Sequence, residues 1–317
     1  MKYRHLGESG LKVSELSLGG WLTFGNTVKD QQIAREIIIT AYENGINFFD
    51  IADIYARGES EKMMGSVLKL FPRHSLVISS KLFWPMSDDP NDRGLSRKHI
   101  MESIDKSLQR IGVDYLDIYF CHRWDEETPL LETIRAMDDL IHRGKILYWG
   151  TSEWTAEQID RANELAAQHN LYPPTVEQPQ YSLLVRKTYE ESVGPAAQRN
   201  GMGTVVWSPL ASGVLTGKYD DGIPEGSRLD NVDWLRDRAN DKALDKVRRM
   251  KAVADGAGIS RADLALAWAL RHEAISSVIT GATRVSQLES NLNAAQIELS
   301  SDVLAELDKI FDPTDES

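Results

Sequence analysis

Short apolar runs alternate with longer amphipathic segments along nearly all of the 317 residues. Eight runs have the length and the content of β-branched and aromatic residues that are typical of strands. They are Glu15–Leu18, Ile46–Asp50, Leu76–Lys81, Tyr115–His122, Ile146–Thr151, Thr175–Gln178, Thr204–Ser208 and Ser277–Thr280. Several are apolar at almost every position, which predicts strands that are buried on both faces of a parallel sheet.

The segments between these runs carry helix signals. The segment Asp30–Asn44 opens on an N-cap aspartate, repeats Ile33, Ile37 and Ala41 at helical spacing, and stops at Gly45. Further helix signals lie at Ser96–Ile111, Leu130–Arg143, Ser300–Ile310 and the capping box that joins Thr155 to Gln158. Strand and helix therefore alternate regularly around the chain.

Eight such alternations without an evident linker predict a (β/α)₈ TIM barrel in a single domain, residues 1–317. A doubly wound sheet is the alternative, but no Gly-rich turn follows a strand; Gly201 and Gly203 precede one. The first thirteen residues predict a β-hairpin that covers the bottom of the barrel. Two long connections, 82–95 and 209–240, follow strands and are candidates for functional loops.

Composition excludes several classes of function. The formal net charge is −12, with a pI of about 5.1, which argues against a nucleic-acid partner. The single cysteine, Cys121, cannot form a disulfide framework, and the histidines lack metal-binding spacing, so no metal site is expected. No signal peptide or membrane-length apolar run is evident, which predicts a cytoplasmic protein without membrane insertion.

Polar residues cluster where the second, third and fourth predicted strands end. These are Asp50 and Tyr55, Lys81, and His122. Because the carboxyl ends of barrel strands meet at one face, we expect the four side chains to lie together. A lysine ammonium beside a tyrosine is expected to lower the pKa of the phenol, while the aspartate holds the lysine and the histidine orients a substrate oxygen. Such a set can protonate a carbonyl oxygen as hydride reaches the carbon.

Other side chains near the strand ends are open to two interpretations. Asp53 is either part of the site or a solvated loop acid. Arg236 and Arg238 are interpreted as surface charges of an acidic loop, whereas Arg93 or Arg123 would favour an anionic substrate. Four aromatic residues follow the first, third and fourth strands and predict an apolar pocket wall: Trp21, Phe83, Trp84 and Trp124.

These residues resemble the aldo-keto reductases, whose tetrad of Asp, Tyr, Lys and His falls on Asp50, Tyr55, Lys81 and His122. The flanking sequence is similar to that of the branch that includes potassium-channel β subunits and related bacterial reductases. The matching stretches are R-G-L-S-R-K-H-I (93–100), E-T-I-R-A-M (132–137), Y-W-G-T-S (148–152), W-S-P-L-A-S-G (207–213), G-K-Y-D-D-G-I-P (217–224) and S-S-V-I-T-G-A (276–282).

The resemblance implies a barrel that reduces aldehydes or ketones with a nicotinamide cofactor, usually NADP(H), with NAD(H) left open. It implies that Tyr55 is the general acid. It also implies a set of cofactor-binding residues: Ser152, Gln178, Trp207, Ser208, Leu210, Ser212, Lys218, Arg228, Gly281, Thr283, Gln287 and Asn291. A small carbonyl compound would be the substrate, and the resemblance leaves a homo-oligomer open.

Departures from the family pattern bear on function. Gly281 and Gln287 replace the basic pair of the wider family, so Arg284 is the candidate for contacting a 2′-phosphate. Glu153 replaces the usual Asn or Arg. His122 stands where channel β subunits tend to carry asparagine, which favours a working reductase. A cofactor-loaded regulatory subunit of a potassium channel is the alternative, and a barrel lyase or isomerase without nicotinamide is a third hypothesis.

Overall fold

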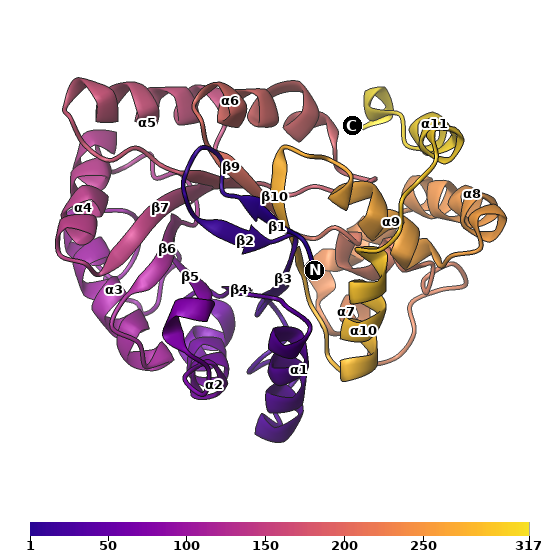
Figure 1. The fold of residues 1–317 in the computed structure, drawn as a ribbon, viewed down its shortest axis with the longest axis horizontal. Helices are drawn as coiled ribbons and strands as arrows, with labels where there is room; N and C mark the ends of the chain where they lie inside the picture. The colour runs from indigo at the N-terminus through magenta and orange to yellow at the C-terminus, as the bar shows by residue number, and fades with distance from the viewer. Residues whose placement is uncertain (317) are drawn as a thin grey trace.

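Eight parallel strands close into a barrel with helices around its outside (Figure 1). The computed structural model describes residues 1–316, so only Ser317 of the predicted domain lies outside the described residues. The strands follow one another around the ring in chain order, and each lies within two residues of its predicted bounds. They are β3 (Leu16–Gly19), β4 (Phe48–Asp50), β5 (Val77–Leu82), β6 (Leu116–Cys121), β7 (Ile146–Ser152), β8 (Val176–Gln178), β9 (Gly203–Val206) and β10 (Ile275–Thr280). The predicted barrel is confirmed.

The outer layer is formed mainly by α1 (Gln31–Glu43), α2 (Glu59–Leu68), α3 (Arg97–Ile111), α4 (Leu130–His142), α5 (Ala156–Gln168), α6 (Gly194–Arg199), α8 (Asp241–Ala257), α9 (Arg261–Leu270), α10 (Val285–Ala294) and α11 (Ser301–Ile310). The predicted N-cap of α1 and the capping box of α5 are both present. Of the apolar residues at helical spacing in α1, Ile37 and Ala41 are buried, whereas the Ile33 side chain is 42% exposed. None of the helices in residues 1–316 has the length and apolarity needed to cross a membrane.

Alternation along the strands separates the interior of the barrel from the layer under the helices. The lower interior is apolar and is filled by Phe48, Val77, Ile118, Phe120, Val176, Val205 and Ile279. Two residues further along β4 the inward position is Asp50, and four further along β5 it is Lys81. The strands therefore place the predicted catalytic side chains at the carboxyl end of the barrel, above an apolar layer.

The predicted hairpin is confirmed as β1 (Tyr3–His5) paired antiparallel with β2 (Lys12–Ser14), and it lies across the amino end of the barrel (Figure 1). Leu6 and Val13 pack against the apolar interior residues from below. The Arg4 guanidinium donates hydrogen bonds to the carbonyls of Leu270 and Ile275, at 2.6 and 2.7 Å. The hairpin therefore closes the end of the barrel that is opposite the polar strand ends.

The long connection 209–240 contains secondary structure of its own. It contains 3₁₀ turns at Ala211–Thr216 and Asp233–Ala239, and the short helix α7 (Arg228–Asn231) between them. Consecutive residues Ala211, Ser212 and Gly213 all have positive φ values, of 47°, 60° and 94°. The loop therefore folds back over the mouth of the barrel.

Gly7 should be the position of the hairpin that is least tolerant of a side chain. Its φ is +58°, and a Cβ there would lie 2.3 Å from the backbone nitrogen of Gly203. We expect Gly7→Ala to lower the free energy of unfolding by at least about 1–2 kcal/mol, from the left-handed backbone alone. Gly10→Ala is the matched control, since a Cβ at Gly10 meets nothing within 4 Å. Urea denaturation followed by circular dichroism measures both, and equal stabilities of the two variants would refute the expectation.

Candidate active site

A cavity of about 1110 Å³ opens at the carboxyl ends of the barrel strands. Most of the predicted site residues line it: Asp50, Tyr55, His122, Ser152, Gln178, Trp207, Ser208, Leu210, Ser212, Lys218, Arg228, Gly281, Thr283, Gln287, Asn291, Trp21 and Trp84. Lys81 lies beneath the surface of the cavity and is fully buried. The volume lies slightly above the usual range for small-molecule pockets, about 300–1,000 Å³, so the cavity has room for a ligand of more than ordinary size.

Two of the predicted wall residues, Phe83 and Trp124, are not among the residues that line the cavity. Phe83 contacts Trp84 edge to face at 5.2 Å between ring centroids, and Trp124 packs in the same manner on the buried Trp154 at 4.8 Å. The aromatic wall instead includes Trp234, which the sequence analysis did not single out and which lies 6.0 Å from Trp21. Position after a strand alone could not distinguish an inward from an outward aromatic ring.

The Lys81 ammonium uses all three of its protons on protein acceptors. Nζ donates to Oδ2 of Asp50 at 2.6 Å, to the carbonyl of Ile51 at 2.8 Å and to Oη of Tyr55 at 3.1 Å. Because Tyr55 accepts this bond, its own hydroxyl proton must point elsewhere. No acceptor for that proton is found in residues 1–316, and the ring lines the cavity, so the proton is available to a ligand.

Asp50 is held as firmly as Lys81. Its Oδ1 accepts hydrogen bonds from Oγ of Ser79 at 2.7 Å and from Nε2 of Gln178 at 3.1 Å. Ser152 donates from Oγ to the carbonyl of Gln178 at 2.9 Å. Residues of β4, β5, β7 and β8 are therefore joined in one polar network at the floor of the cavity.

The structure corrects the expected direction of the pKa shift at Tyr55. Burial raises the pKa of the Tyr55 phenol well above its ordinary value, and the negative charge of Asp50 acts in the same direction. The charge of Lys81 is offset by its ion pair with Asp50, so Lys81 acts on the phenol as a hydrogen-bond donor rather than as a net positive charge. The phenol therefore holds its proton at neutral pH.

His122 is neutral for related reasons. Burial lowers the pKa of its imidazole well below the ordinary value, and the positive charges of Lys81 and Arg123 reinforce the shift. Its ring centroid lies 5.9 Å from that of Tyr55. A neutral imidazole carries one N–H donor, so Tyr55 and His122 can offer two proton donors to one oxygen atom in the cavity.

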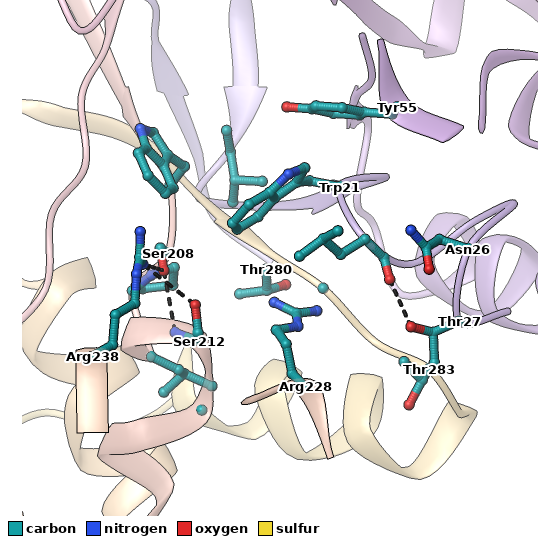
Figure 2. A pocket seen from close by; sticks show the side chains of 18 of the residues that line it. Trp21, Asn26, Thr27, Tyr55, Ser208, Ser212, Arg228, Arg238, Thr280 and Thr283 are labelled. Atoms are coloured by element: carbon teal, nitrogen blue, oxygen red, sulfur yellow. Dashed lines mark hydrogen bonds between the residues drawn. The ribbon is translucent and has the colours of Figure 1, made fainter. Parts of the chain in front are cut away.

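The other end of the cavity is cationic (Figure 2). Arg238 donates from Nη1 to Oγ of Ser208 and to Oγ of Ser212, both at 3.3 Å, which corrects its interpretation as a surface charge. The Arg228 guanidinium points toward Thr280 and Trp21 in Figure 2, with its central carbon 5.9 Å from the centroid of the Trp21 ring. The backbone N–H groups of residues 211–213 are already bonded within the loop, to Ser208 and Leu210, so the positive charge at this end comes from the arginine side chains.

Glu153 is a second residue whose position the sequence did not reveal. It lines the cavity with φ of 59°, and its Oε1 accepts hydrogen bonds from Nε1 of Trp207 at 2.9 Å and from the backbone nitrogen of Gln180 at 2.6 Å. The carboxylate thereby fixes the orientation of the Trp207 indole. The departure from the family pattern at this position was visible in the sequence, but the pairing with Trp207 was not.

Asp53 lies behind the site and not in it. It is 1% exposed, does not line the cavity, and neither carboxyl oxygen has a hydrogen-bond partner within residues 1–316. Burial raises the pKa of Asp53 well above its ordinary value, and the nearby Glu61, which is paired with Arg110, adds to the shift. The solvated-acid interpretation of Asp53 is therefore wrong.

The buried Asp53 should make stability depend on pH. Above about pH 4 the carboxyl of Asp53 is ionised in the unfolded chain and still protonated in the folded chain. The contribution of Asp53 to the free energy of unfolding is therefore full below about pH 4 and falls as the pH rises. Asparagine does not titrate. We expect the stability of Asp53→Asn relative to wild type to increase from pH 4.5 to 7, by up to about 1.4 kcal/mol per pH unit.

Urea denaturation at several pH values measures this difference. The variant Asp88→Asn, at an exposed position, controls for the loss of one carboxylate. Only the slope of the difference with pH is used, so a constant packing effect of asparagine does not matter. A difference that is flat or falls with pH would contradict the buried, protonated carboxyl.

Known proteins are similar to the chain over most of its length. The model of the "Aldo/keto reductase family" matches residues 15–312. A "Probable voltage-gated potassium channel subunit beta" of Arabidopsis thaliana is 47% identical over 303 residues, which cover 94% of this chain and 92% of that protein. A putative subunit of the same kind from Schizosaccharomyces pombe is 42% identical over 322 residues, covering 98% and 94%. One from Oryza sativa subsp. japonica is 46% identical over 303 residues, covering 94% and 92%. The chain belongs to the aldo/keto reductase family.

Proposed function

We propose that the chain is an NADP(H)-dependent reductase that converts aldehydes or ketones to alcohols. Membership of the family establishes the general class, an oxidoreductase. The observation that carries the proposal is the hydrogen bond from Lys81 to Tyr55, which leaves the Tyr55 proton facing a large cavity. A protonated phenol with a buried ammonium behind it is suited to giving a proton to a carbonyl oxygen and to holding the resulting phenolate.

The cavity fits a dinucleotide phosphate. Arg238 and Arg228 have no carboxylate partner within 4.0 Å in residues 1–316, and both line the cavity together with Lys218. Gly213 also lets Lys218 lie against the chain, because a Cβ there would be 2.8 Å from Cε of Lys218. Positively charged side chains without carboxylate partners suit the negative charges of a pyrophosphate and a 2′-phosphate, which favours NADP(H) over NAD(H).

When bound, the reduced nicotinamide supplies the hydride. The remaining chemistry falls to side chains of this chain. Trp207, fixed by Glu153, offers a flat apolar face for a ring. Tyr55 and His122 donate hydrogen bonds to the carbonyl oxygen, and Tyr55 gives up its proton as negative charge develops there. Lys81 stays bonded to Oη and stabilises the phenolate, while Asp50 keeps Lys81 charged and aimed.

A second candidate function is a cofactor-binding regulatory subunit of a potassium channel. The names of the relatives motivate it. The two functions differ in turnover, since a regulatory subunit would bind NADPH tightly and consume it very slowly. The complete set of Asp50, Tyr55, Lys81 and His122 at the cavity favours the reductase.

Tyr55→Phe should abolish reduction and retain cofactor binding. The variant keeps the ring and loses only the hydroxyl, so we expect kcat to fall by about 10²–10⁴, the usual range for a general acid. NADPH consumption with a panel of aldehydes measures turnover, and quenching of tryptophan fluorescence measures the Kd for NADPH. Unchanged turnover would refute the role of Tyr55. Tight NADPH binding by a wild-type protein that reduces no aldehyde would favour the regulatory function.

Arg238 and Arg236 form a matched pair for testing the cationic end. Arg238 lines the cavity, whereas Arg236 pairs with Asp233 at 3.3 Å outside it. We expect Arg238→Met to raise the Kd for NADPH at least about tenfold, as the loss of a charge-assisted bond of about 1.5–3 kcal/mol implies. Arg236→Met should leave the Kd within about twofold. Equal effects of the two substitutions on the Kd would contradict the assignment of Arg238 to cofactor binding.

A further inference from the structure

Arg123 is a cation at the catalytic end of the cavity that the proposed function does not use. It follows β6 directly and lines the cavity beside His122. Its Nη1 donates to the carbonyl of His122 at 2.5 Å and lies 3.5 Å from Oγ of Ser152. Its guanidinium carbon lies 5.7 Å from the centroid of the Trp84 ring. The guanidinium is therefore held in place by the backbone at one corner.

The charge of Arg123 has no anionic partner in residues 1–316. No aspartate or glutamate oxygen in that range lies within 4.0 Å of its nitrogens, and Nε and Nη2 have no hydrogen-bond acceptor there. The acids that line this end of the cavity are engaged elsewhere, Asp50 with Lys81 and Glu153 with Trp207. A half-buried, unpaired guanidinium attracts an anion, and two free N–H edges match the two oxygens of a carboxylate.

Arg123 is distinct from the cations assigned to the cofactor. Arg228 and Arg238 lie at the end of the cavity formed by Ser208, Ser212 and Thr283 (Figure 2). The charge of Arg123 instead acts on the proton donor, Tyr55. Burial and Asp50 raise the pKa of Tyr55, and the positive charge of Arg123 lowers it. An anion held by Arg123 would therefore lie next to the reacting carbonyl, as part of the substrate.

We propose that Arg123 selects carbonyl substrates that carry a carboxylate a few atoms from the reacting carbon. The inference deepens the proposed reductase function and rests on it. Tyr55 and His122 bind the carbonyl oxygen, Arg123 binds the carboxylate, and the exposed Trp84 ring covers the apolar spacer between the two. Neutral aldehydes leave Arg123 unpaired and bind less well.

The test uses a matched pair of substrates, 4-oxobutanoate and its methyl ester, which share the four-carbon oxo chain; the ester replaces the negative charge by a neutral O-methyl group. The readout is the ratio of kcat/KM for the acid to kcat/KM for the ester. We expect Arg123→Met to lower this ratio at least tenfold and Arg123→Lys to restore part of it. Arg57→Met is the control, because Arg57 is exposed two residues from Tyr55, does not line the cavity, and carries the same charge.

A ratio in Arg123→Met that equals the wild-type ratio would overturn the inference, whether or not both activities fall, because a purely positional role affects acid and ester alike. An equal drop of the ratio in Arg57→Met would also overturn it, since the effect would then be general electrostatics. Binding gives a readout independent of turnover. In wild type the Kd of butanoate, measured by isothermal titration calorimetry, should be at least tenfold lower than the Kd of butanamide, and Arg123→Met should lose this preference.

The binding readout separates failure of the inference from failure of the proposed function. If wild type reduces neither substrate, the reductase proposal fails, and the comparison of butanoate with butanamide still decides whether Arg123 binds carboxylates. If both substrates are reduced and butanoate shows no preference over butanamide, the reductase proposal stands and the assignment of Arg123 is wrong.

Discussion

The buried ion pair between Lys81 and Asp50 is the constraint on which the rest of the site depends. Burying two charges is costly unless every proton and lone pair finds a partner. Here Nζ of Lys81 has three acceptors, and Asp50 is also bonded to Ser79 and Gln178. Loss of one member of such a pair typically costs about 3–5 kcal/mol, so the network fixes the barrel strands and the Tyr55 hydroxyl together.

The same pair also determines what Lys81 can do. A lysine with no counter-ion would stabilise the phenolate by charge and would lower the pKa of Tyr55. Paired with Asp50, it leaves burial as the largest influence, and the pKa of Tyr55 rises. The geometry thus provides a phenol that is protonated in the free protein and that gives up its proton only when an oxygen atom in the cavity becomes sufficiently basic.

Much of this arrangement could be predicted from the sequence. The alternation of strand and helix patterns predicted the barrel. Because Asp50, Lys81 and His122 stand at the ends of predicted strands, they could be predicted to lie together on one face of it. The sequence pattern did not predict the direction of a side chain where the backbone lies outside regular strands and helices. Arg238 lies in a loop of 3₁₀ turns, and Trp124 follows a strand without its alternation, so neither direction could be predicted. Asp53 is buried near Glu61 of α2 and Arg110 of α3, a tertiary arrangement that no local pattern encodes.

A crystal structure of the protein with oxidised cofactor would test the central claim most directly. The quantity to measure is the distance from Nζ of Lys81 to Oη of Tyr55. The account predicts that it stays at hydrogen-bond length, near the 3.1 Å found here, with Nζ still bonded to Asp50 and the hydroxyl directed into the cavity. An ammonium turned away from the phenol, or a Tyr55 hydroxyl bonded to a protein acceptor, would contradict the account.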